Sequence, residues 1–347
     1  LGRQEIVLDG HRLFGHTGWT PGAATQDAIR LTHSAGNHTI GYFYMENLNN
    51  GDKADQNDSD IATHTFYGNV QGVLGGNLSG YFVYTDYENA NTVASDGITE
   101  DQNQWYTIGA RQAGKLQGID YRVEYYHQFG DASVPAGDLN AGINANYTAL
   151  TDSCECVDRD AHMFGIRLGK TFSNAKGAPT LTLWYDRLSG TDDDDVTGND
   201  YGGFDTLFDT GHKFYGFMDA YLSRSLLGTA GMGLEDIAVK FKMSPAAGWT
   251  AKADMHWFST AVDMDGDNGT LVAANTLLND ATTQSNNLGA ELDLTLAHKY
   301  DANTKISLGY SHYWTTNTFA LFNGFGTAGV NSNADADWFY VMMDTKF

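Results

Sequence analysis

Apolar and polar side chains alternate along much of the chain. The segment from Trp338 to Phe347 shows the pattern, because Phe339, Val341 and Met343 fall on one side and polar or aromatic residues fall on the other. Successive side chains of a β-strand point to opposite faces, so this period of two predicts a strand with one apolar face. Such a face packs either on a protein core or on membrane lipid.

The same alternation predicts about 14 strands along the chain. They cover residues 2–9, 25–33, 38–46, 63–73, 78–87, 104–112, 120–129, 162–171, 180–188, 235–243, 250–258, 287–298, 304–313 and 337–347.

The connections between these strands alternate in length. Short ones at residues 34–37, 74–77, 113–119, 172–179, 244–249 and 299–303 take turns with long polar ones at 10–24, 47–62, 88–103, 130–161, 189–234, 259–286 and 314–336. A soluble sandwich has no reason to lengthen every second loop, whereas an up-and-down membrane barrel has short periplasmic turns and long external loops. We therefore expect one domain, residues 1–347, that is an all-β transmembrane antiparallel barrel with a periplasmic C-terminus and extracellular long loops.

Composition agrees with this fold and narrows the function. The 347 residues include 40 Gly, 19 Tyr and 18 Phe but only 4 Pro, which is typical of strands joined by glycine turns. No apolar run approaches the ~20 residues of a membrane helix, and the mean hydropathy is -0.37. Alternation hides barrel strands from such averages. The net charge of -23 argues against nucleic acid as a partner.

Acidic residues gather in the long connections. Solvated loops are one interpretation, and divalent-cation binding at a lipopolysaccharide surface is the other. The sharpest candidate has carboxylates at alternate positions, Asp263, Asp265 and Asp267. It departs from the calcium loop of helix-loop-helix proteins, because Asn268 stands where that loop has Gly and Ala274 where it has Glu. Calcium is the one cofactor that the sequence suggests.

Two more connections carry residues that could bind metal or react, and the sequence favours metal in only one of them. Asp192 to Asp195, with Asp200, form a second acidic candidate for calcium. Cys154 and Cys156 lie in one loop, and two thiols alone make no zinc site. We expect them to be an oxidised pair or inert thiols, without a catalytic role.

Placing a charged side chain in the hydrocarbon of the membrane costs free energy, so the charged residues of the predicted strands are expected to face the lumen. In one interpretation the basic members form successive weak sites for an anionic solute. In the other, acids and bases pair with one another and only stabilise the barrel. The predicted lumen residues are Arg3, Glu5, Arg30, Arg111, Arg122, Glu124, Arg167, Asp186, Lys240, Lys242, Lys252, Asp254, His256, Glu291 and Asp293.

Several short motifs follow one another along the chain in a characteristic order. They are Gly2-Arg3-Gln4-Glu5, Arg12, Trp19, Asp27-Ala28-Ile29-Arg30-Leu31, Thr107-Ile108-Gly109-Ala110-Arg111, Tyr121-Arg122-Val123-Glu124 with Gln128 and Gly130, Leu234-Glu235-Asp236 and Leu288-Gly289-Ala290-Glu291-Leu292-Asp293-Leu294. In this order they resemble the alginate-export family of outer-membrane porins. The resemblance implies an 18-stranded barrel with an arginine-rich pore, and about four strands and a signal peptide before Leu1. A 14-stranded relative is the alternative.

We therefore predict an outer-membrane porin, a monomer embedded in lipid and lipopolysaccharide, for passive diffusion or export of a polar, anionic or saccharide-like solute. It is not expected to be an enzyme, since no convincing nucleophile and base share a face. The alternatives are a structural sheath for a multihaem cytochrome and, last, an outer-membrane enzyme. The longest connection, residues 189–234, either folds into the lumen or forms an extra hairpin.

Overall fold

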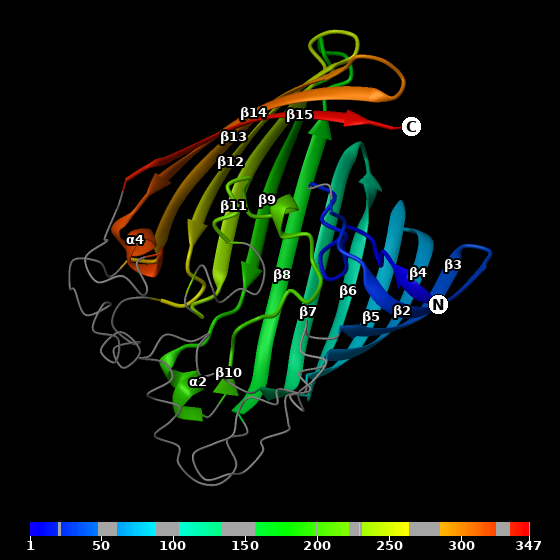
Figure 1. Cartoon of the computed structure of the whole chain (residues 1–347), viewed down its shortest axis with the longest axis vertical. Helices are drawn as coiled ribbons and strands as arrows, with labels where there is room; N and C mark the ends of the chain where they lie inside the picture. The colour runs from blue at the N-terminus through cyan, green and yellow to red at the C-terminus, as the bar shows by residue number, and fades with distance from the viewer. Residues whose placement is uncertain are drawn as a thin grey trace, which may run out of the picture.

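The computed structural model describes residues 1–19, 22–47, 61–87, 104–132, 157–198, 200–221, 229, 231–263, 285–323 and 334–346. Its strands form one sheet that curves around an interior (Figure 1). The strands are β1 (Gly2–Gln4), β2 (Gln26–Ala35), β3 (His38–Asn47), β4 (Ile61–Val73), β5 (Gly76–Tyr87), β6 (Gln104–Leu116), β7 (Ile119–Ala132), β8 (Val157–Thr171), β9 (Thr180–Leu188), β10 (Asp200–Tyr201), β11 (Leu234–Met243), β12 (Trp249–Ser259), β13 (Asn287–Lys299), β14 (Thr304–Thr315) and β15 (Ala336–Thr345).

Strands that follow one another in sequence lie side by side and antiparallel, as an up-and-down barrel requires. The only departure on this path is that β9 pairs with β11, because the two-residue β10 pairs in parallel with β8. The predicted all-β, up-and-down fold is confirmed, and each expected strand has a counterpart. Within the described residues, β1 pairs only with β2 and β15 only with β14.

The two faces of the sheet differ in chemistry. One face, the outer face, exposes large apolar side chains along almost every strand, including Leu31, Phe66, Ile108, Leu183, Ile237, Leu294 and Val341. The other, the inner face, carries the buried residues that are polar or charged, such as Glu124, Asp186 and Asp236. A soluble sheet would bury its apolar face, so this arrangement is that of a membrane barrel.

The first predicted strand is much shorter than expected. β1 ends at Gln4, and the chain then turns inward, with left-handed backbone at Asp9 (φ 45°) and His11 (φ 69°). Residues 5–19, the first inner segment, lie beside residues 202–221, the second inner segment (the blue and green coils inside the sheet in Figure 1). A parallel bridge joins Phe14 and Phe208, and the Gly15 N–H donates to the Phe208 carbonyl at 2.7 Å.

The hydrophobic core lies between these inner segments and the inner face. Its fully buried members come from both layers, among them Phe14, Phe43, Met163, Phe204 and Phe214. The connection after β9 therefore folds inward, which is the first of the two arrangements that the sequence left open. The connection at residues 10–24, expected to be an external loop, also folds inward over residues 10–19.

Helices play a minor part. α2 (Asp193–Gly198), the single-turn η1 (Gly211–Lys213) and α4 (Asn317–Asn323) all lie in long connections. In the described part of the chain, none of the helices is long and apolar enough to cross a membrane.

Candidate functional site

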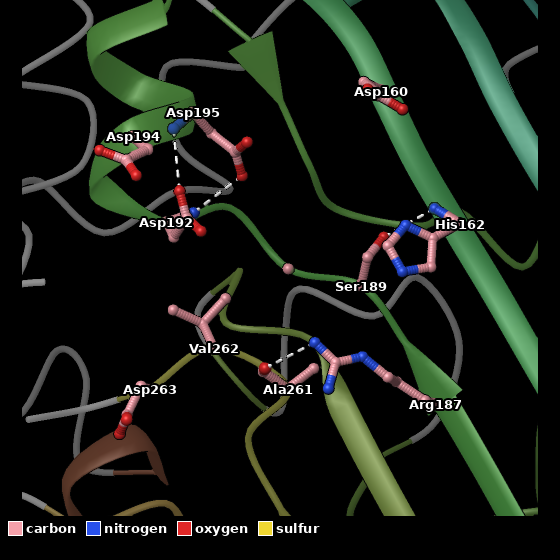
Figure 2. A pocket seen from close by; sticks show the side chains of 11 residues that line it. Asp160, His162, Arg187, Ser189, Asp192, Asp194, Asp195, Ala261, Val262 and Asp263 are labelled. Carbon is pink, nitrogen blue, oxygen red and sulfur yellow. Dashed lines mark hydrogen bonds between the residues drawn. The ribbon is translucent and has the colours of Figure 1, made fainter. Parts of the chain in front are cut away.

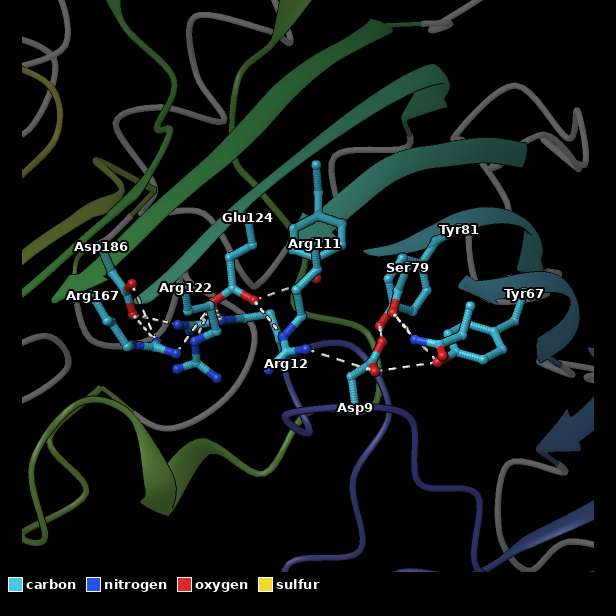
Figure 3. Close-up of polar contacts among 12 residues, drawn as sticks. Asp9, Arg12, Tyr67, Ser79, Tyr81, Arg111, Arg122, Glu124, Arg167 and Asp186 are labelled. Atoms are coloured by element: carbon cyan, nitrogen blue, oxygen red, sulfur yellow. Dashed lines mark hydrogen bonds and ion pairs between the residues drawn. The ribbon is translucent and has the colours of Figure 1, made fainter. Parts of the chain in front are cut away.

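Arg12 of the first inner segment lies at the centre of a buried charged cluster. Its guanidinium donates to Glu124 Oε1 on β7 at 3.3 Å and, through Nη2, to Asp186 Oδ2 on β9 (Figure 3). It also donates to the Tyr215 hydroxyl at 2.6 Å. It also lies over the Phe214 ring, 3.8 Å from the ring centre. Only 2% of Arg12 is exposed, so its charge depends on these partners.

Three strand arginines surround the same two carboxylates. Arg167 approaches Asp186 at 3.1 Å and Glu124 at 3.4 Å. Arg111 and Arg122 lie farther from Glu124, at 3.8 Å and 3.7 Å. The antiparallel register explains the assembly, because it places Arg111 opposite Glu124, and Arg122 opposite Arg167. We call Arg12, Arg111, Arg122 and Arg167 the arginine cluster.

Asp9 ties the first inner segment to the neighbouring wall. It accepts hydrogen bonds from the hydroxyls of Tyr67 on β4, at 3.2 Å, and Tyr81 on β5, and it lies 3.6 Å from Arg111 (Figure 3). Asn69 and Tyr67 both reach Ser79 on the same wall. The first inner segment is therefore fixed to strands on both sides of the arginine cluster.

Lys213 of the second inner segment adds a further cation. Desolvation by the surrounding protein, together with the positive charges of Arg122, Arg111 and Arg12, lowers the pKa of Lys213, and the Lys213 side chain reaches solvent. Nearby, burial raises the pKa of Asp209 to about 7, so this carboxyl is a weak counter-charge at neutral pH. Lys213 belongs to the longest connection, one of whose two expected arrangements was inward, but no periodic pattern marks Lys213 itself as a lumen residue.

Basic and acidic residues continue along the inner face on β11 to β13. Lys240 lies 3.4 Å from Asp254 and 4.5 Å from the centre of the Trp184 ring. His256 Nδ1 lies 2.9 Å from Asp236, and both side chains are fully buried. Lys242 and Lys252 are also inner-face residues, since they stand opposite each other in the register that pairs Lys240 with Asp254.

Glu291 and Asp293 hold the second inner segment in place. Glu291 Oε1 accepts the Met218 N–H at 2.8 Å, and Asp293 Oδ2 accepts the Phe217 N–H at 3.3 Å. Gly216, directly before the donors Phe217 and Met218, has a φ of 85°, a left-handed backbone conformation that favours glycine. These two predicted lumen residues are therefore occupied by backbone donors of the chain itself.

The comparisons with known proteins agree with this architecture. The sequence model of a family described as alginate export matches residues 1–323. The chain belongs to the alginate export family. It is accordingly an outer-membrane channel of β-barrel fold, as its resemblance implied, and its location is the bacterial outer membrane. No curated protein sequence matches the chain significantly.

Solved structures that resemble this alginate export protein are remote in sequence. OccD3 (OpdP) of Pseudomonas aeruginosa is 11% identical over 99% of this chain and 72% of its own, with a TM-score of 0.48. OccK10 (OpdN) of the same organism is 9% identical over 97% and 79%, with a TM-score of 0.49. The NanC porin is 8% identical over 83% and 95%, with a TM-score of 0.33.

The three predicted lumen residues nearest the start of the chain, Arg3, Glu5 and Arg30, also lie apart from the arginine cluster. Arg3 is a correction: it stands opposite Asp27, and this position alternates with Ala28 and Arg30 of the inner face, so Arg3 belongs to the outer face. There it pairs with Asp27 at 2.8 Å. Glu5 follows the end of β1 and is exposed. Arg30 is an exposed inner-face residue near the Phe43 ring.

A cavity separate from the arginine cluster lies at the end of the sheet where the long connections begin. It has a volume of about 610 Å³, and its lining includes Asp160, His162, Arg187, Asp192 and Asp195 (Figure 2). Arg187 pairs with a neighbouring carboxylate on β11 at 2.5 Å. Asp192 and Asp195 accept each other's backbone N–H groups, and burial raises the pKa of Asp195 to about 6.

The calcium candidates are only partly within the described structure. Asp263 lines this cavity, whereas Asp265 and Asp267 fall outside the described residues, as do Cys154 and Cys156. Among the residues that the structure describes, no group of three or more His, Cys, Asp or Glu side chains could hold a metal ion. The calcium loop stays a prediction.

Proposed function

We propose that this outer-membrane channel passes small anionic, saccharide-like solutes, and that Arg111, Arg122 and Lys213 are the cations that a solute's carboxylate contacts. The observation that carries the proposal is the charge balance of the arginine cluster. Four guanidinium groups share three carboxylates, Glu124, Asp186 and Asp9, so positive charge is in excess even before Lys213 is added.

The cations of this cluster differ in how fully they are neutralised. The Arg12 and Arg167 side chains are 1% and 7% exposed and have close carboxylate partners. The Arg111 and Arg122 side chains are 13% and 14% exposed, with longer ion pairs, and Lys213 is exposed. Unbalanced positive charge therefore faces the solvent beside Arg111, Arg122 and Lys213, which favours an anion that binds weakly and leaves again.

The inner segments narrow the route to this site. A Cβ atom at Gly10 would lie 2.5 Å from Arg122 Nη1, so the first inner segment packs directly on the cluster. A solute that passes here contacts the cations one group at a time, which suits a monosaccharide acid or short oligomer. Because the chain's own inner segments pack on the inner face, where a partner protein would have to sit, this arrangement also favours a channel over a sheath around another protein.

The orientation follows from the lengths of the connections. Short turns close the sheet at one end and long connections leave it at the other, and outer-membrane barrels keep their short turns in the periplasm. We infer that Thr345 at the end of β15 is periplasmic and that the long connections are extracellular. Charged extracellular loops would then contact lipopolysaccharide.

Ion selectivity of single channels in planar bilayers tests the proposal. Under a potassium chloride gradient we expect the wild-type reversal potential to show anion preference, and glucuronate to block the current more strongly than glucose. Arg111→Ala, Arg122→Ala and Lys213→Ala should each reduce the anion-to-cation permeability ratio by about twofold to tenfold. Arg3→Ala is the matched control, since Arg3 lies on the outer face. A cation-selective wild type, or a reversal potential unmoved by the triple variant, contradicts the proposal.

A further inference from the structure

The outer face carries an apolar hollow of about 900 Å³ over β2 to β5. Its floor is a pair of glycines, Gly68 on β4 and Gly80 on β5, which stand opposite each other. In the same row the register places Ile40 on β3 and Ala110 on β6. Large side chains flank this row on both sides, so the glycines are the low point between two apolar walls.

The walls are outer-face side chains. The row Tyr42, Phe66 and Phe82 lines the hollow on one side of the floor. On the other side, Val70 and Leu78 form the next outer-face row, beyond the residues that line the hollow. Phe66 is 54% exposed, which confirms that this row does not point into the protein. Outer-face side chains bound the hollow, and it is continuous with the lipid-facing surface of the barrel.

Nothing within the chain explains why these two positions are glycine. A Cβ atom on Gly68 or Gly80 would meet no heavy atom within 4 Å, and neither residue has a left-handed φ. Other strand glycines have a clear cause, because a Cβ at Gly109 or Gly309 would collide with a tyrosine ring of the neighbouring strand. Glycine weakens a strand, and it is found where a ligand approaches the backbone closely.

We propose that this hollow is a binding groove for one acyl chain of a phospholipid. Its lining is mostly apolar, with Arg30, Thr32 and His33 as polar members, and continues the surface that faces the hydrocarbon of the membrane, so a hydrocarbon chain is the matching occupant. His33 lines the groove at the side of the short turns, and His38 lies beside it on the same face. Their imidazole groups suit a lipid phosphate, and the choice of phospholipid rests on the periplasmic orientation proposed above.

Native mass spectrometry of the detergent-solubilised protein tests the groove. The probes are dipalmitoyl phosphatidylethanolamine and, separately, lipid A. We expect the wild type to retain one phospholipid, and Gly68→Leu or Gly80→Leu to lower the retained fraction about tenfold because a leucine fills the floor. Ala253→Leu is the control, an outer-face change on β12 away from the groove. Circular dichroism establishes that each variant folds.

Three outcomes would overturn the proposal. The first is equal phospholipid retention by wild type, Gly68→Leu and Ala253→Leu. The second is retention of lipid A in place of phospholipid, which would assign the groove to the other leaflet. The third is a wild-type dimer in sedimentation that Gly68→Leu dissociates, which would make a second copy the occupant. Ion selectivity is measured independently, so failure of the groove leaves the channel proposal standing.

Discussion

Arg12 links the first inner segment to two strands, and its neutral replacement should be costly. In Arg12→Ala, Glu124 and Asp186 would lose their nearest shared cation inside the protein. Breaking a buried ion pair from one side costs about 3–5 kcal/mol, because a buried charge is left without its partner. We expect the free energy of unfolding, from urea titration in detergent micelles, to fall by about this amount. Arg3→Ala removes an exposed ion pair and should change it little.

Asp209 should make the inner segments more stable in mild acid. Burial raises its pKa to about 7 in the folded protein, against ~3.9 in an unfolded chain. The folded state then holds the proton more tightly, so this contribution is full below pH ~4 and is lost as the pH rises to ~7. Asp195, with a pKa of about 6, acts in the same sense.

Thermal unfolding between pH 5 and pH 7.5 measures this effect. We expect the wild-type melting temperature to decrease over this range, and Asp209→Asn to show a smaller decrease because the variant no longer titrates. Asp301→Asn serves as the control. The backbone N–H groups of Asn303 and Thr304 lower the pKa of Asp301, so Asp301 titrates below this range. An unchanged slope in Asp209→Asn would rule out this role for Asp209.

The charged residues show what can be predicted about single positions. Strand alternation predicts Arg111, Arg122 and Arg167 on one face, and the register places them there. Arg3 was assigned to the wrong face, because a strand of three residues is too short for alternation to fix its register. Arg12 drew attention only as part of a family motif. One signal was available, since Arg12 sits directly before Leu13 and Phe14 in a segment with no strand pattern.

At the scale of elements, the backbone beside Gly216 attaches the second inner segment to β13, through the Phe217 and Met218 N–H groups. Alanine at this position needs an unfavourable left-handed φ, and its Cβ would collide with the Glu291 carboxylate. Gly216→Ala should therefore release the Phe217 and Met218 N–H groups from β13. We expect larger or more frequent open levels in single-channel recordings and faster proteolysis within residues 202–221.

A matched glycine variant separates this effect from a general loss of stability. Gly22 has no left-handed φ, and a Cβ there would meet nothing within 4 Å. Gly22→Ala should leave conductance and proteolysis as in the wild type. If Gly216→Ala behaves like Gly22→Ala, the contacts with Glu291 and Asp293 do not hold the segment.

The strands could be predicted from the sequence far better than the irregular inner segments. The strands could be predicted because one face must be apolar for lipid, and that demand imposes a period of two. The inner segments could not, because they are irregular and bury themselves through single contacts such as Phe14 with Phe208 and Arg12 with Asp186. Such contacts join residues 174 to 194 positions apart in the chain, and no local pattern marks them.

The whole molecule is a sheet with lipid outside and charge inside, and β15 offers a direct test of this arrangement. Val341 and Met342 are neighbours in sequence on opposite faces: Val341 is 64% exposed on the outer face, and Met342 shares the inner face with Asp344. A lysine facing hydrocarbon near mid-membrane costs about 2–4 kcal/mol, whereas a lumen position tolerates one.

We therefore expect Val341→Lys to lower the free energy of unfolding in lipid vesicles by about 2–4 kcal/mol, and Met342→Lys to lower it by less than about 1 kcal/mol. Both variants place the same charge at neighbouring positions of the same strand, so net charge cancels in the comparison. The face of the sheet is then the main difference between them, since strand propensities differ by at most about 1 kcal/mol. Equal losses in the two variants, or a larger loss in Met342→Lys, would mean that β15 does not present Val341 to lipid, and the assignment of inner and outer faces would have to be reversed along the strands paired with it.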